Sequence, residues 1–161
     1  MPSIKRKFLR YNDYAHADFQ TIFKGISKEK IFRLYCNETR SCYIENAGNG
    51  KFIKHPLPVE AQFAPVNAII CEDLDMDGIK DILLAGNEYQ AEVLGGRYDA
   101  SYGSFLKGTA AKTFSSVPGR HSGFSIQGAV KDMALISVAD GTKRVLVAVN
   151  NDSLRVFKVL K

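Results

Sequence analysis

Four aspartates surround one glycine in a short segment near the middle of the chain. They are Asp73, Asp75, Asp77 and Asp81. Alternating side chains can converge on one centre only where the backbone curls, and Gly78 favours a curl because it has no Cβ. Carboxylates this close together repel one another unless a cation lies between them. Ca²⁺ suits such a set because it takes about 6 to 8 oxygen ligands in a flexible shell. The spacing predicts a calcium loop, with the carbonyl of Ile79 as a further ligand.

Apolar segments that flank this loop decide what kind of calcium site it is. Residues 66–71 precede the loop, residues 82–86 follow it, and both are predicted to be strands. The start of the loop also fits an EF-hand, which needs flanking helices and a bidentate glutamate at the twelfth position. That position holds Leu84, within an apolar strand. A metal-binding hairpin is therefore favoured, with Asp81 at the ninth position, over an EF-hand or an acidic turn that stays empty.

The chain from Ser41 onward has the pattern of antiparallel β-structure. Apolar or alternating segments are separated by turns rich in Gly, Asn and Asp. Pro56 and Pro58 predict a surface loop over residues 55–65. The fold class expected is all-β, with strands over residues 42–45, 51–54, 66–71, 82–86, 98–106, 113–117, 130–137, 144–149 and 154–160.

The first 40 residues have a different pattern. Residues 4–11 are expected to form a short strand. Apolar residues at helical spacing predict a short helix over residues 14–25, with Asp18 as its N-cap and Gly25 at its end. A second turn is expected at residues 27–30, and residues 31–36 fit a strand or a helix equally well.

Composition limits the classes of function. The chain has 161 residues, 45% of them hydrophobic and 24% charged, as in a soluble globular domain. No apolar run reaches the length of about 18 residues that a membrane-spanning helix needs. The net charge of +5 is spread along the chain rather than clustered, which disfavours nucleic-acid binding.

Cysteine and histidine give no sign of a catalytic site. Cys36, Cys42 and Cys71 match no metal-ligand spacing and are expected to be buried free thiols, although a Cys36–Cys42 bridge across a hairpin stays open. The three histidines are far apart in sequence, and the chain has no Gly-x-Ser-x-Gly, His-Glu-x-x-His or phosphate-loop motif. The sequence therefore predicts a protein that is not an enzyme.

Two motifs together resemble the FG-GAP and VCBS repeats, whose blades build β-propellers like the head of the integrin α-subunit. One is strand, Asp-x-Asp-x-Asp-Gly-x-x-Asp, strand over residues 66–87, and the other is a strand, an Asn-x-Gly-x-Gly turn and Phe52 over residues 43–52. The resemblance implies a partial β-propeller of antiparallel blades over residues 41–161, with residues 1–40 as an insertion between blades that carries a short helix. Residues 98–114 resemble a second Gly-turn hairpin. Residues 130–149 resemble a second calcium hairpin that keeps only Asp140 and Gly141, so one metal site is expected.

Blade number bears on whether the chain acts alone. A closed propeller needs about 4 to 8 four-stranded blades, and the expected strands make roughly two to three. The chain is therefore expected to be the C-terminal portion of a longer protein that supplies the remaining propeller blades.

The resemblance also implies a role. It is that of a non-catalytic calcium-binding β-propeller repeat module in binding or scaffolding, whose ligand is an unknown protein or carbohydrate. An extracytoplasmic location is expected, whether secreted, periplasmic or at the cell surface, with the export signal on a missing N-terminal part. Two alternatives are the accessory domain of a secreted hydrolase or lyase and, because the isoelectric point is near 9.1, a weak nucleic-acid binder.

Overall fold

The structure, a computed structural model, describes residues 2–27, 29 and 32–160. The chain divides into two compact units, Met1–Glu38 and Thr39–Lys161. Among the described residues, no helix has the length and apolar character needed to cross a bilayer.

The first unit contains short helices, and it corrects two expectations. Helix α1 (Pro2–Lys7) replaces the strand expected over residues 4–11. Its last turn carries basic residues, which interact favourably with the carbonyl end of a helix. The single helix expected over residues 14–25 is instead split into α2 (Tyr11–Ala15) and α3 (Phe19–Ile22).

Asp18 explains where the helical segment breaks. It is the N-cap of α3, as predicted, and its Oδ1 accepts a hydrogen bond from the Thr21 amide at 2.8 Å. An N-cap residue needs extended backbone angles, so α2 cannot continue through it. Helix α3 then ends at Ile22, before Gly25. The turn expected at residues 27–30 and the segment 31–36 fall partly on residues 28, 30 and 31, outside the described residues; residues 32–36 form neither helix nor strand.

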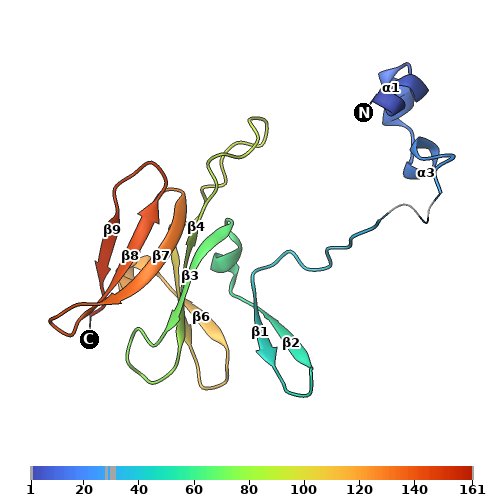
Figure 1. The fold of residues 1–161 in the computed structure, drawn as a ribbon. Helices are drawn as coiled ribbons and strands as arrows, with labels where there is room; N and C mark the ends of the chain where they lie inside the picture. The colour runs from blue at the N-terminus through green and yellow to red at the C-terminus, as the bar shows by residue number, and fades with distance from the viewer. Residues whose placement is uncertain (1, 28, 30–31, 161) are drawn as a thin grey trace. The chain divides into compact units, whose positions relative to one another are not determined.

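The second unit consists of three antiparallel sheets, and the all-β expectation is confirmed (Figure 1). The first sheet pairs β1 (Cys42–Asn46) with β2 (Phe52–Pro56). The second contains β3 (Val66–Glu72), β4 (Asp81–Gly86), β5 (Ser104–Gly108) and β6 (Phe114–Val117). The third contains β7 (Val130–Ser137), β8 (Lys143–Val149) and β9 (Arg155–Lys158). Within each sheet the strands pair in chain order.

Two short helical turns connect the sheets. The 3₁₀ helix η2 (Val59–Gln62) lies between β2 and β3, and α4 (Gly119–Ser122) follows β6. The surface loop expected over residues 55–65 therefore also contains the end of β2 and a helical turn. Gln62 stabilises this connection, because its Nε2 donates to the carbonyls of Ser41 and Leu57 at 3.0 and 3.1 Å.

The second and third sheets pack on each other through a shared apolar core. Ala68, Ile70 and Leu83 of the second sheet join Met133, Val145 and Val147 of the third in one buried cluster. A smaller cluster covers part of the opposite face of the second sheet, where residues before β3 lie on β4 and β5; its buried members are Ala61, Ile82, Leu84 and Leu106. Strand β4 is consequently buried at every position.

Two asparagine amides join the second and third sheets. The Asn67 side chain donates to the carbonyl of Val130 at 2.9 Å. Asn87 is buried, and its side chain donates to the carbonyls of Ser101 and Gly128 at 2.8 and 3.0 Å. A buried amide that makes its hydrogen bonds avoids the cost of an unpaired polar group. These bonds also fix how the two sheets pack on each other.

The cysteines differ from the sequence expectation. All three are free, Cys36 and Cys71 are exposed, and Cys42 is half-buried. Cys71 is exposed because β3 alternates, and its inward positions are Ala68 and Ile70. Burial of all three thiols was therefore a wrong expectation.

Candidate metal centre

The acidic loop connects β3 to β4 as a hairpin, and its backbone curls where the sequence predicted. Gly78 has φ +86°, in the region that favours glycine. Met76 also has a positive φ, +64°, which no feature of the sequence indicated. Leu74 is buried in the core between the second and third sheets and anchors the start of the loop. The curl and the anchor together fix the course of the loop backbone.

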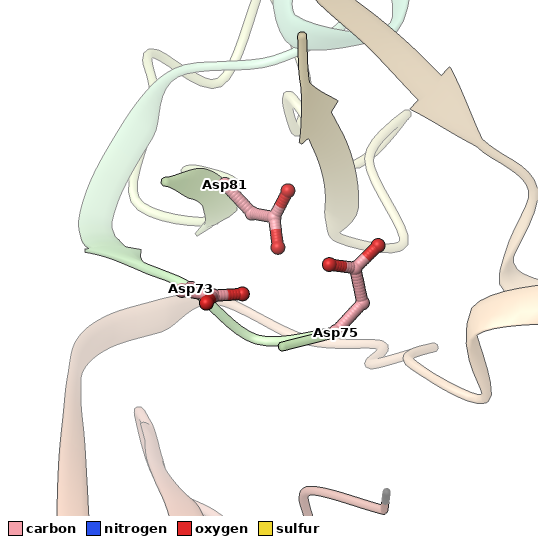
Figure 2. Close-up of side chains that lie close together, drawn as sticks. All are labelled: Asp73, Asp75 and Asp81. Atoms are coloured by element: carbon pink, nitrogen blue, oxygen red, sulfur yellow. The ribbon is translucent and has the colours of Figure 1, made fainter. Parts of the chain in front are cut away.

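Three of the four predicted aspartates come together. Asp73, Asp75 and Asp81 each offer a carboxylate oxygen, and these oxygens all lie within 4.8 Å of one another. Figure 2 shows the three carboxylates around a common space. Carboxylate oxygens are the ligands of hard divalent cations, so this cluster could hold a metal ion.

Backbone amides orient two of these carboxylates. Asp81 is completely buried, and its two oxygens accept hydrogen bonds from the amides of Leu74 at 3.0 Å and Gly108 at 2.9 Å. Oδ2 of Asp73 accepts one from the Gly78 amide at 2.9 Å. Two amides of the loop and one amide of β5 therefore hold these carboxylates in place.

One oxygen in the cluster lacks a partner. Oδ1 of Asp73 is buried and accepts no hydrogen bond. A buried, unpaired carboxylate oxygen is unfavourable, because it has lost its water without gaining a donor. A cation bound among the three aspartates would supply the missing interaction. By this observation the residues present fit a metal ion.

Asp77 lies outside the three-aspartate cluster. Its Oδ2 is 2.9 Å from the ammonium of Lys107, and its Oδ1 accepts a hydrogen bond from the Ile79 amide at 2.9 Å. Lys107 also forms an ion pair with Asp75. Asp75 thus belongs both to the three-aspartate cluster and to the ion pairs of Lys107. The ligand role of the Ile79 carbonyl stays a prediction.

The ion pairs of Lys107 shift the pKa of Lys107 itself and of Asp77. The pKa of Asp77 is lowered, chiefly by the hydrogen bond from Lys107 and then by the Ile79 amide. The pKa of Lys107 is raised, because Asp75 and then Asp77 accept hydrogen bonds from its ammonium. Lys107 is therefore a cation at neutral pH, where the loop carboxylates are ionised.

Sequence reasoning missed two residues of this site, Lys107 and Gly108. Both lie on β5, and the pairing of Ile82 with Leu106 brings them beside Asp81. A Cβ on Gly108 would overlap the Lys80 carbonyl oxygen, so only glycine lets this amide reach Asp81. Nothing in the spacing of the loop residues pointed to β5. The one available signal was the excess of negative charge in the loop, which favours a nearby cation.

The histidines of the second unit have separate surroundings. Nε2 of His55 is 3.1 Å from a Glu45 carboxylate oxygen, and its ring stacks on Tyr43. His121 lines a cleft of about 560 Å³ beside the acidic loop, whose other walls include Leu74, Phe105, Phe124 and Phe157. The walls of this cleft are mainly apolar.

Comparisons with protein-family models, with curated proteins and with solved structures gave no match for this chain.

Proposed function

We propose that this chain is a non-catalytic, calcium-binding β-propeller repeat module that acts in binding or scaffolding within a longer secreted or surface protein. The observation that carries the proposal is the convergence of Asp73, Asp75 and Asp81, one of which has a buried oxygen with no donor. These residues would hold the ion, and the ion would neutralise their charges and fix the β3–β4 turn. Ca²⁺ is preferred over Mg²⁺ because it accepts irregular, oxygen-rich shells, whereas Mg²⁺ requires near-ideal octahedral geometry.

Two hairpins share the same irregularity in strand pairing, which supports the proposed repeat of blades. Strand β3 has an irregularity between Val66 and Ala68 in its pairing with β4. Strand β7 has one at the corresponding place, between Val130 and Asp132, in its pairing with β8. Each hairpin provides the first two strands of its sheet, and strands β3 and β7 contact each other. Two successive units with the same irregularity are what a repeated blade would give.

The second hairpin turn supports a single metal site. Asp140 there accepts hydrogen bonds from the amide and the hydroxyl of Thr142, at 2.8 and 2.6 Å. Gly141 has φ +78°, so the curl is kept. One carboxylate that is already paired within its own turn offers too few oxygens for Ca²⁺.

Apolar side chains on the outer faces of the sheets support the presence of further blades. Ile69, which pairs with Leu84 on the face of β3 turned away from the third sheet, is 64% exposed. The outer face of the third sheet carries a row of apolar residues across its strands, namely Ala134, Leu146 and Val156. Neighbouring blades of a longer chain would cover both faces, since exposed apolar sheet faces associate readily.

The proposed location follows from the proposed ion. Free Ca²⁺ is abundant outside the cytoplasm, where modules with weak sites bind it at about 10⁻⁴ to 10⁻³ M. The proposed ligand of the module is a protein or a carbohydrate.

Calorimetric titration of the chelator-treated chain with Ca²⁺ tests the proposal. We expect about one equivalent to bind, with Mg²⁺ much weaker. Asp73→Asn is expected to weaken binding strongly, because it removes one carboxylate charge and one of the two side-chain oxygens. Asp140→Asn in the second hairpin is the matched control and is expected to bind as the natural chain does. A folded natural chain that takes up no Ca²⁺ at millimolar concentration would contradict the proposal.

A further inference from the structure

Lys107 lies beside the acidic loop where a neutralising cation is needed. Its ammonium is 2.9 Å from Asp77 Oδ2 and also pairs with Asp75. These side chains are partly shielded from solvent, with 40% of the lysine and 31% and 32% of Asp75 and Asp77 exposed. The loop has a lysine of its own, Lys80, but that ammonium pairs with Glu72 at 3.0 Å. The charge that neutralises the loop therefore comes from β5.

Asp75 cannot bind a divalent ion and keep its ion pair with Lys107 without repulsion between the two cations. It belongs to the three-aspartate cluster and also to the ion pair with Lys107. A divalent ion at the cluster would repel an ammonium bound to the same carboxylate. Asp77, the fourth predicted ligand, lies outside the cluster and is paired with the same lysine. Metal binding and the Lys107 ion pairs thus compete for two carboxylates.

We propose that Lys107 is a tethered counter-ion that competes with the divalent cation for Asp75 and Asp77 and so sets the metal affinity of the loop. This inference rests on the proposed calcium site. Without metal, the lysine offsets part of the negative charge of the loop and keeps the loop folded. With metal bound, the ammonium moves into solvent on its flexible stem, which its exposure allows.

A purely structural role for Lys107 makes the opposite prediction. If the lysine only holds Asp75 in position for the ion, then its removal leaves the loop less ordered and weakens metal binding. If it competes, its removal strengthens metal binding and at the same time destabilises the metal-free protein. The two effects can be measured separately.

The test is calorimetric titration of the full chain with Ca²⁺ at fixed ionic strength, after treatment with chelator. Lys107→Met is expected to bind Ca²⁺ roughly 3- to 30-fold more tightly than the natural chain, because two ion pairs no longer oppose the metal. Lys107→Arg keeps the charge and is expected to stay close to the natural affinity. Lys80→Met is the matched control, since it removes an equal charge near the loop without touching Asp75 or Asp77; it is expected to change the affinity by less than about twofold.

A second measurement uses the unsubstituted chain. Nitrogen-15 NMR of the lysine ammonium groups is expected to show Lys107 in an ion pair in the chelated protein, and at the position of a solvated lysine once Ca²⁺ is added. The ammonium of Lys112, which pairs with Glu45 at 2.6 Å, should not move. This readout does not depend on whether a variant folds.

The outcomes separate this inference from the proposed function. Equal or weaker Ca²⁺ binding by Lys107→Met, or an unchanged Lys107 signal in a chain that binds Ca²⁺, overturns the competition. Binding by Lys107→Met but not by the natural chain supports the competition and counts against calcium binding by the natural protein. An absence of binding by both proteins overturns both.

Discussion

Asp81 contributes to the fold of the acidic loop through backbone hydrogen bonds. It is completely buried, and each of its oxygens accepts a backbone hydrogen bond, one from the loop and one from β5. Its carboxylate therefore joins the turn to the neighbouring hairpin whether or not an ion is bound.

Replacement of Asp81 by asparagine is expected to destabilise the metal-free protein. The new amide group would place a donor opposite the amide of Leu74 or Gly108, which leaves a buried donor unpaired. A loss of about 2 to 4 kcal/mol in the free energy of unfolding is expected, measured by urea denaturation in chelator. Asp75→Asn, at a partly exposed position, should cost less than about 1 kcal/mol. Equal stability of the two variants would contradict this role for Asp81.

Gly108 is the second residue on which the turn depends. Alanine there is expected to push β5 away from Lys80 and to break the hydrogen bond to Asp81. We expect a loss of about 1 to 3 kcal/mol in thermal or chemical unfolding. Gly95→Ala is the control, because its Cβ would have no neighbour closer than 3.6 Å and the backbone is not in the left-handed region. A Gly108→Ala protein as stable as this control would rule out the close approach.

At the scale of elements, local pattern predicted the strands well where alternation and turn residues agree. Strand β7 spans residues 130–137, as predicted, and the glycine curl of the acidic loop and the Asp18 cap were also predicted correctly. Each depends on neighbours within a few residues, which sequence shows directly. The expected strand near the N-terminus is a helix, because a short apolar and basic segment has no periodicity long enough to distinguish the two.

The parts of the site that sequence could not predict depend on pairing between distant elements. Lys107 reaches Asp75 and Asp77 only because β4 pairs with β5. Asn67 and Asn87 join two sheets through carbonyls of residues 63 and 41 positions further along. The sequence position of a polar residue gives no indication of a partner that is defined by strand register.

The β1–β2 hairpin is joined to the second sheet by an ion pair that acid should weaken. Glu45 accepts hydrogen bonds from Lys112 at 2.6 Å and from His55 at 3.1 Å. Its pKa is lowered, first by Lys112 and then by His55. A carboxyl whose pKa is lower in the folded state stabilises the fold above its unfolded pKa, near 4.3, and this contribution is lost as the pH falls through the folded pKa.

Stability measured between pH 5 and pH 3 checks this contribution. The natural chain is expected to lose stability on acidification more steeply than Glu45→Gln, which carries no charge to neutralise. Lys112→Met removes the main cause of the shift and is expected to flatten the same part of the curve. Parallel pH curves for all three proteins would show that the ion pair contributes nothing.

At the scale of the whole molecule, the second and third sheets pack together but keep apolar residues on their outer faces. Ile69 on one side and Val156 on the other are 64% and 52% exposed. In the proposed longer propeller both residues would lie between blades. In the chain by itself they would favour association between copies.

Charged substitutions on these two faces are expected to reduce self-association without unfolding the protein. Ile69→Lys and Val156→Lys should each lower the apparent mass seen by sedimentation at high concentration, while the unfolding transition changes little. Ile70→Lys, on the buried side of the same strand, is the control and is expected to unfold the protein. A natural chain that is monomeric at all concentrations would count against uncovered blade faces.

The most direct test of the calcium site is a crystal structure of the chain grown in millimolar CaCl₂, with anomalous scattering measured. We predict an anomalous peak among Asp73, Asp75 and Asp81, about 2.3 to 2.6 Å from the carboxylate oxygens, including the unpaired Oδ1 of Asp73. Lys107 should no longer contact Asp75 in that crystal. Water at this position, with the Lys107 ion pairs intact and no anomalous signal, would contradict the calcium site.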